Sequence, residues 1–280
     1  MVHGTARRRV RGARYASRRA SDSRRMELLA RAGLAARGVM YVIIGWLALQ
    51  IGFGHPGGQA DRSGALRLVA QTPFGSVALW LLLIGFIGMT LWRLSEAAYG
   101  GAEPGGHKTS TRLAALARAA FYGFVAYGIW KFALGMGAPA STDTQSQDLT
   151  ASAMRLPGGR LIVALIGLAL VAGGVHLAHG ALKRKFRKRL ELGRMRPRTR
   201  RTVERLGQIG GIARGTVFAT AGIFLVVAAA RYQPQQAKGI DSSLRALASA
   251  PLGPWLLVLV ALGLVTFGVY SFCEARWRRV

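Results

Sequence analysis

The step Ala36-Arg37-Gly38 opens an apolar run near the start of the chain, and it returns as Ala117-Arg118-Ala119 and Ala213-Arg214-Gly215. Each of these runs is followed by a polar stretch, a Pro-x-Gly step and a second apolar run. The Pro-x-Gly steps begin at Pro73, Pro157 and Pro251. Because this order of features occurs three times, the chain is predicted to be a tandem repeat of a two-helix unit.

Six apolar blocks hold most of the hydrophobic residues, which make up 51% of the 280 residues. Each block has roughly 20 residues, so as a helix it would span about 30 Å, the thickness of a bilayer's hydrocarbon core. Helices satisfy their own backbone hydrogen bonds in lipid, and the blocks lack the alternation of a β-barrel. The predicted membrane spans are residues 34–53, 74–92, 113–134, 161–182, 212–230 and 252–273.

The predicted fold is therefore an all-α, polytopic membrane protein of three repeats, residues 30–100, 112–182 and 208–276. Residues 1–29 are expected to form a basic, disordered cytoplasmic arm, and residues 183–207 a basic cytoplasmic linker that continues the fourth span as a helix. Because each repeat has two spans, all three insert in the same orientation. A bundle with pseudo-three-fold symmetry about the membrane normal is expected, either open or solid at its axis.

Basic residues predict how the bundle is oriented. Of the 39 Lys and Arg residues, 31 fall on the side of the two termini and of the connections between repeats, and 8 fall on the other side. By the positive-inside rule, both termini face the cytoplasm of a multi-pass protein in the cell membrane. Four acidic residues then lie on the outer face: Asp61, Asp143, Asp148 and Asp241.

Charged residues recur near the cytoplasmic ends of the spans. Arg37, Arg118 and Arg214 lie at the start of the odd spans, whereas Glu96 and Glu274 lie at the end of two even spans. Since these charges share one depth, they are candidates for ion pairs between repeats. Snorkelling of the arginines to lipid phosphates is the alternative, and a role in handling a substrate is a further one.

Two histidines on the fourth span, His176 and His179, are candidates for handling a proton or a ligand, because three residues place them on one helix face. The alternative is a pair at the membrane interface. No carboxylate or cysteine at a suitable spacing completes a metal site, so no metal and no cofactor is expected. The sequence also shows no nucleophile with its base and no glycine-rich phosphate loop, so an enzyme is not expected.

Basic runs at residues 7–25 and 183–205 are typical of segments that bind anionic phospholipid headgroups beside a bilayer. Such runs also bind nucleic acid, but no recognition fold accompanies them here, and nucleic acid is not an expected partner. The sequence points to no particular protein partner.

The outer ends of the repeats carry further signals. Proline is tolerated in the first turn of a helix, so each even span is expected to begin at its proline. Residues 63–70 and 241–248 are predicted to be short helices on the outer leaflet, with Ser63 and Asp241 as N-caps. Four aromatic residues are expected at the membrane interfaces: Trp46, Trp92, Tyr270 and Trp277.

The tripled pair of spans resembles a bacterial membrane family known as domain of unknown function 1206, described as three repeats of a two-helix unit and common in high-GC actinobacteria. Arg37-Gly38, Arg214-Gly215, Pro73 and Pro251 carry this resemblance, which covers about residues 30–276. The middle repeat departs from the pattern at Ala119 and Gly180. The family implies a fold and supplies no activity, catalytic residues or cofactor.

Two hypotheses for function follow. A non-enzymatic membrane protein with a structural or interaction role in the cell envelope is favoured, because the spans contain no buried acid pair and no large polar cluster. A transporter or channel for small solutes or ions is the alternative, since three parallel pairs about an axis are able to surround a solute path.

Overall fold

Six long helices account for most of the computed structural model, which describes residues 24–54, 58–101, 106–137, 140–249 and 253–279. All six are long and apolar enough to cross a membrane, which confirms the predicted all-α polytopic fold. Residues 1–23 of the expected arm lie outside the described residues, but residues 24–29 already belong to the first helix. The helices are α2 (Arg24–Gly52), α4 (Gly75–Tyr99), α5 (Thr109–Ala133), α7 (Gly159–Leu182), α8 (Pro197–Arg231) and α10 (Gly253–Trp277).

A short helix connects the two spans of each repeat at the end away from the recurring arginines: α3 (Arg62–Ala70), α6 (Thr142–Met154) and α9 (Ile240–Ala248). The predicted N-caps are wrong, because the cap residues are Asp61 for α3 and Gly239 for α9. The predicted contact with the outer leaflet is also wrong for the apolar faces of α3 and α9. Leu66 and Leu244 are fully buried in the hydrophobic core of the bundle.

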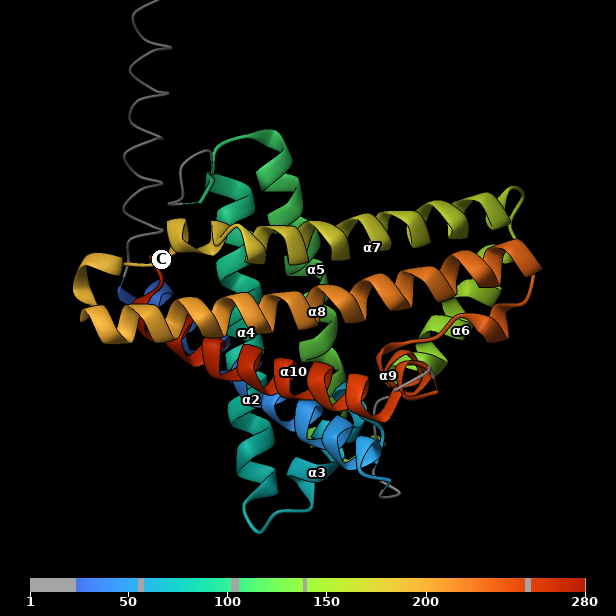
Figure 1. Ribbon diagram of the computed structural model, residues 1–280, viewed down its shortest axis with the longest axis horizontal. Coiled ribbons are helices and arrows are strands. Elements are labelled where there is room, and N and C mark those ends of the chain that lie inside the picture. Colours follow the sequence, from blue (N-terminus) through green and yellow to red (C-terminus); the bar gives the residue numbers. More distant parts are fainter. Residues whose placement is uncertain (1–23, 55–57, 102–105, 138–139, 250–252, 280) are drawn as a thin grey trace, which may run out of the picture.

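Neighbouring repeats pack through the second span of one repeat and the first span of the next: α4 on α5, α7 on α8, and α10 on α2. The third of these contacts joins the last repeat to the first, so the order of repeats is cyclic. Within repeats, α2 packs on α4 and α8 packs on α10, whereas α5 and α7 do not pack along each other. In Figure 1, α4 and α5 run from top to bottom while α7 and α8 run across the picture, so these pairs are strongly inclined to each other.

Glycines at a spacing of seven residues allow the close contact between α2 and α10. A Cβ atom added to Gly38 would lie 3.0 Å from the carbonyl oxygen of Gly268, and one added to Gly45 would lie 2.9 Å from that of Ala261. Helices in lipid associate through such close backbone packing, because no hydrophobic driving force acts between them there.

The same spacing recurs where α8 packs on α7. A Cβ atom on Gly215 would lie 2.6 Å from the carbonyl oxygen of Gly174, and one on Gly222 would lie 2.8 Å from that of Gly167. The glycines that follow Arg37 and Arg214 are thus positions where one repeat meets the preceding repeat in the cyclic order.

The recurring Pro-x-Gly step also has a packing role, carried by its glycine. The even spans begin at Gly75, Gly159 and Gly253, so the prediction that they begin at the proline is wrong for Pro73 and Pro157; Pro251 lies outside the described residues. A Cβ atom on these three glycines would lie 1.9–2.5 Å from a carbonyl oxygen at the end of the preceding short helix. Only glycine fits so tight a connection.

The linker does not continue the fourth span as expected. α7 ends at Leu182, and two 3₁₀ turns, η1 (Lys185–Arg189) and η2 (Leu192–Arg194), follow before α8. The backbone N–H of Glu191 donates to the carbonyl of Trp277 at 2.9 Å, and that of Arg279 donates to the carbonyl of Arg189 at 3.0 Å. The linker is therefore folded back against the C-terminal end of α10.

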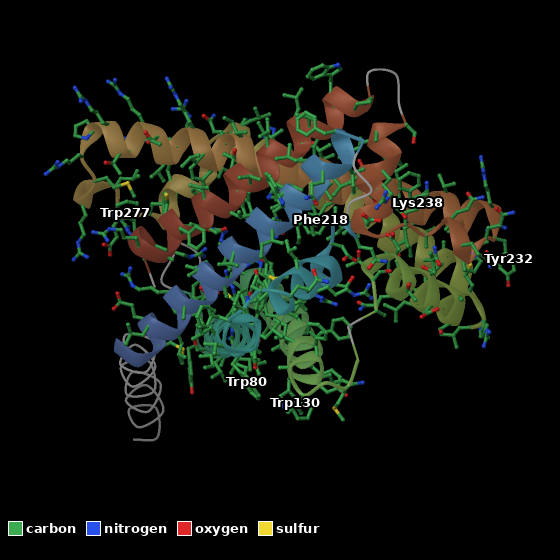
Figure 2. The ribbon with its side chains drawn as sticks, turned by 90° about the horizontal axis from the view of Figure 1, so that it is seen from below. Trp80, Trp130, Phe218, Tyr232, Lys238 and Trp277 are labelled. Carbon is green, nitrogen blue, oxygen red and sulfur yellow. The ribbon has the colours of Figure 1, made fainter. Side chains whose placement is uncertain are left out.

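The surface around the bundle is rich in exposed apolar side chains, as a lipid-facing surface is. Trp80 of α4 and Trp130 of α5 are 41% and 42% exposed, and Figure 2 shows both on the side of this pair that faces away from the other helices. Two of the expected interfacial aromatics are instead core residues, because Trp92 and Tyr270 are each only 3% exposed.

Candidate functional site

A cavity of about 520 Å³ lies at the centre of the bundle, near the ends of the spans that carry the recurring arginines. All six spanning helices contribute to its wall, and the linker contributes Lys185, Phe186 and Arg189. Two wall residues, Phe121 of α5 and Leu177 of α7, are 57% and 38% exposed. The cavity therefore reaches the surroundings on the side where α5 and α7 do not pack along each other.

The cavity wall is strongly cationic. Six arginines and Lys185 line it, against one acidic residue, Glu274. A smaller adjoining cavity of about 250 Å³ shares three of these arginines and adds Glu96. The arginines of the main cavity are Arg37, Arg93, Arg118, Arg189, Arg214 and Arg278.

Arg37 and Glu274 form a buried ion pair that joins α2 of the first repeat to α10 of the third. Arg37 also donates from Nε to the hydroxyl of Ser271 at 3.2 Å. The second oxygen of Glu274 accepts from Nη1 of Arg278 at 3.1 Å. Glu274 is 4% exposed, so one carboxylate holds two buried guanidinium groups.

The other acidic residue at this depth, Glu96, pairs with Arg93 on its own helix and with none of the three recurring arginines. Arg93 is 4% exposed and its guanidinium lies over the ring of Trp92, 4.0 Å from the ring centre. The Nε of Arg93 and the hydroxyl of Tyr270 are both buried and have no hydrogen-bond partner. Both residues line the cavity.

The remaining recurring arginines, Arg118 and Arg214, form no ion pair with a carboxylate in the described part of the chain. Arg118 is exposed on α5 and forms no ion pair with the described residues. Arg214 lies over aromatic rings, with its guanidinium carbon 5.0 Å from the ring centre of Phe267 and 5.3 Å from that of Phe218. Its Nε is buried without a hydrogen-bond partner.

The two histidines are not brought into one site. Both are exposed on α7, and His176 lines the cavity whereas His179 does not. Among the described residues, no three His, Cys, Asp or Glu side chains are close enough to hold a metal ion.

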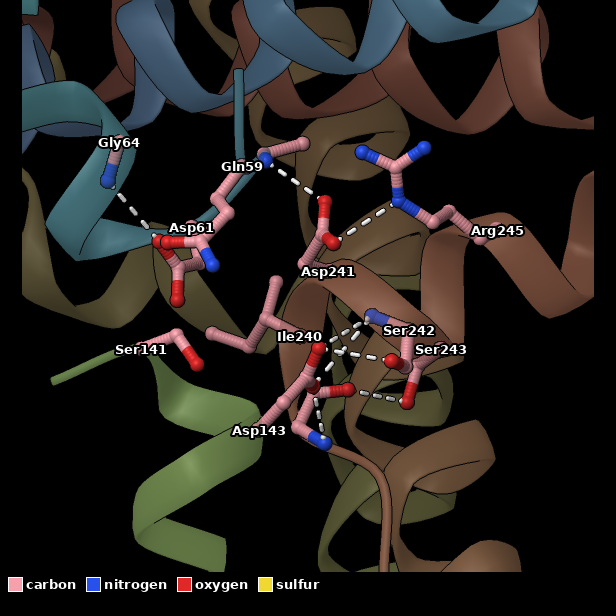
Figure 3. A network of polar contacts seen from close by, with 12 residues as sticks. Gln59, Asp61, Gly64, Ser141, Asp143, Ile240, Asp241, Ser242, Ser243 and Arg245 are labelled. Atoms are coloured by element: carbon pink, nitrogen blue, oxygen red, sulfur yellow. Dashed lines mark hydrogen bonds and ion pairs between the residues drawn. The ribbon is translucent and has the colours of Figure 1, made fainter. Parts of the chain in front are cut away.

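At the opposite end of the bundle, one carboxylate from each repeat bonds to the next repeat, and we call these three the carboxylate ring: Asp61, Asp143 and Asp241 (Figure 3). Asp61 accepts from the backbone N–H and the hydroxyl of Thr142, at 2.7 and 2.9 Å. It also caps its own helix by accepting from the N–H of Gly64 at 3.0 Å.

The other two carboxylates complete the cycle. Asp143 accepts from the N–H of Gly239 at 2.6 Å and from the hydroxyl of Ser242 at 2.7 Å. Asp241 accepts from the N–H of Ala60 at 2.7 Å and from Nε of Arg245 at 2.9 Å. The ring thus links the first repeat to the second, the second to the third and the third to the first.

Replacing Asp61 by Ala is expected to lower the free energy of unfolding by about 2–3 kcal/mol, because buried donors lose a charged acceptor. Unfolding of the purified protein in mixed detergent micelles measures this. Asp148→Ala is the control, since Asp148 is an exposed carboxylate on α6 at the same end of the bundle and should change stability by less than about 0.5 kcal/mol. Equal effects of the two substitutions would contradict a stabilising ring.

Several residues of the cavity carry no repeat signal in the sequence. Arg93 has Leu177 and Ser271 at the matching distance from the other prolines, and Arg278 follows the last span. Lys185 and Arg189 lie in the linker, whose folded-back course depends on contacts with the distant C-terminus. In the sequence, the one indication of this cavity was that the charged residues near the ends of the spans lie at the same depth.

The fold and the site together define a multi-pass α-helical membrane protein built from three copies of a two-helix unit, with a cationic cavity where the copies meet. The family described as Domain of Unknown Function (DUF1206) matches the chain three times, over residues 32–100, 113–184 and 209–278. These matches cover most of the chain, so the chain belongs to this family, and the resemblance noted in the sequence is confirmed.

A relative in Bacillus subtilis (strain 168), the uncharacterized protein YxxB, is 28% identical over 255 residues, which are 89% of this chain and 90% of that protein. No solved structure matches the chain.

Proposed function

We propose that this integral membrane protein is non-enzymatic and serves a structural or interaction role in the cell envelope. The supporting observation is that polar residues of this protein bond neighbouring repeats to each other at both ends of the bundle. Arg37 pairs with Glu274 at one end, and the carboxylate ring closes the other end.

Between these two polar layers, the buried side chains on α2 and α10 are apolar. They include Met40, Ile44 and Leu47 on α2 and Val260 and Leu264 on α10. A solute would have to cross this apolar layer, and a hydrophobic constriction of this kind opposes ion passage. This packing favours the structural role.

Transport of a small anion is the second candidate, because the cationic cavity would attract one. Proteoliposomes loaded with chloride, phosphate or a fluorescent organic anion test the two candidates. We expect flux no faster than in protein-free liposomes. Saturable flux that Arg118→Gln and Arg214→Gln abolish would favour transport and overturn the structural role.

We place the protein in the cell membrane with both termini in the cytoplasm, on the strength of its basic residues. Single cysteines in a Cys273→Ser background test this, with a maleimide that does not cross membranes. Asp148→Cys should react in intact cells, whereas Arg198→Cys in the linker should react only after permeabilisation. Labelling in the reverse order would overturn the orientation.

In this orientation the linker lies beside the inner leaflet, where we propose that it binds anionic phospholipid headgroups. Arg194, Arg198 and Arg201 are exposed there. Each basic residue near an anionic surface contributes about 1 kcal/mol of attraction.

A further inference from the structure

We infer that the central cavity is a binding site for the phosphate-bearing headgroup of an anionic phospholipid, held by Arg93, Arg118 and Arg214 in the cavity wall. The inference rests on the proposed orientation, which places the cavity at the level of the inner-leaflet headgroups. It concerns residues within the spans and is separate from the surface attraction proposed for the linker.

The first argument is charge. Among the described residues, seven basic side chains and one acidic side chain, that of Glu274, line the cavity. Glu274 is already shared by Arg37 and Arg278, and Arg93 pairs with Glu96, whereas Arg118 and Arg214 form no ion pair with the described residues. Cations gathered this closely inside a membrane protein repel one another unless an anion lies between them, and ionisable groups at such depth are typically functional.

The second argument is the set of buried donors that lack partners. The Nε groups of Arg93 and Arg214 and the hydroxyl of Tyr270 are buried without hydrogen bonds, and all three residues line the cavity. Buried polar atoms normally have partners, so such a cluster calls for a ligand. Arginine binds phosphate with paired N–H donors, and these strong, charge-assisted bonds match the donors left here.

The third argument is shape. A volume of about 520 Å³ lies within the range of about 300–1,000 Å³ that is usual for small-molecule sites. The cavity reaches the surroundings beside Phe121 and Leu177, two apolar residues on the helices that fail to pack together. A headgroup inside the cavity would therefore have a route along which its acyl chains rejoin the bilayer, which favours a lipid over a free phosphate ion.

Native mass spectrometry of the full-length protein in mild detergent tests the inference, with titrated phosphatidylglycerol, phosphatidylcholine and inorganic phosphate as probes. We expect one phosphatidylglycerol bound at least about tenfold more tightly than phosphatidylcholine, since the site offers charge-assisted bonds to an anion. Arg118→Gln with Arg214→Gln should reduce this binding at least about tenfold.

Two matched controls separate the cavity from general charge attraction. Arg231→Gln removes the same charge from an exposed position at the other end of α8 and should change binding less than about twofold, because surface charges are screened. Gly180 lines the cavity, and an added Cβ there would have only Lys185 within 4 Å, at 3.9 Å. Gly180→Trp should therefore fill the cavity without changing its charge. Gly173→Trp, on the same helix with no atom that close, should bind normally.

Three outcomes would overturn the inference: no preference for phosphatidylglycerol, controls that weaken binding as much as the cavity variants, or inorganic phosphate that competes at concentrations equal to the lipid's. The last outcome would identify a soluble phosphate site in place of a lipid site. Each of these results is independent of the flux assay, so a failure here leaves the proposed structural role standing.

Discussion

Glu274→Ala is expected to lower the free energy of unfolding by about 3–5 kcal/mol, the effect of removing one partner from a buried ion pair. The carboxylate bonds to both Arg37 and Arg278, and the side chains of all three residues are at most 7% exposed. Without it, the buried guanidinium group of Arg37 loses its carboxylate partner in the wall of an already cationic cavity. Because Arg37 and Glu274 belong to different repeats, the contact between α2 and α10 is weakened as well.

The control for this prediction is Glu27→Ala on α2. Glu27 also pairs with an arginine, Arg31, but its side chain is 45% exposed, so its loss should cost less than about 1 kcal/mol. Detergent unfolding followed by tryptophan fluorescence measures both variants. The double variant Arg37→Met with Glu274→Met should lose less unfolding free energy than the sum of the losses in the two single Met variants. Replacing both partners by apolar side chains leaves fewer unbalanced charges. Equal losses for Glu274→Ala and Glu27→Ala would show that the buried pair is unimportant.

The order of the helices was predictable because it depends on composition and spacing along the chain. Apolar runs of membrane thickness, separated by recurring steps, predicted the six spans and three repeats. Most of the helices extend beyond the predicted spans at the ends that carry the recurring arginines, as α8 does from Pro197. The backbone hydrogen bonds of these helices continue past the last apolar residues. The apolar pattern alone therefore does not give the helix ends.

The pairing of charges was predictable only in part. Arg37 and Glu274 share a depth, and the structure pairs them. Glu96 has the same register as Glu274, yet it pairs with Arg93, a residue found in one repeat only. The partner of a charged group depends on which helix lies next to it. For Glu96 the partner lies three residues away on the same helix, while Arg37 is already paired with Glu274.

The hydrogen bonds of the carboxylate ring were likewise not predictable from the sequence. The ring carboxylates Asp61, Asp143 and Asp241 were visible in the sequence within a group of four acids, but their partners are mostly backbone N–H groups such as those of Ala60, Thr142 and Gly239. Backbone donors have no sequence signature. Their positions follow from three short helices whose starts converge in space, and that convergence depends on the cyclic packing of the whole bundle.

Gly174→Ala is expected to lower the free energy of unfolding by about 1–3 kcal/mol, as overpacking of a tight contact does. An added Cβ at Gly174 would lie 2.6 Å from both the carbonyl oxygen of Gly215 and the backbone nitrogen of Ala219. These are backbone atoms of α8, which no side-chain rotation moves away. The two helices must therefore separate along the contact that joins the second repeat to the third.

The neighbouring residue supplies the control, because Gly173 has no atom within 4 Å of the position of an added Cβ. Gly173→Ala should leave stability unchanged or raise it by up to about 1 kcal/mol, since alanine favours a helix interior over glycine. Thermal unfolding in detergent compares the two variants under one condition. Adjacent glycines on one helix then give changes of opposite sign, and the difference isolates the backbone contact between α7 and α8 from helix propensity. If both substitutions stabilise the protein, close backbone packing does not hold these two repeats together.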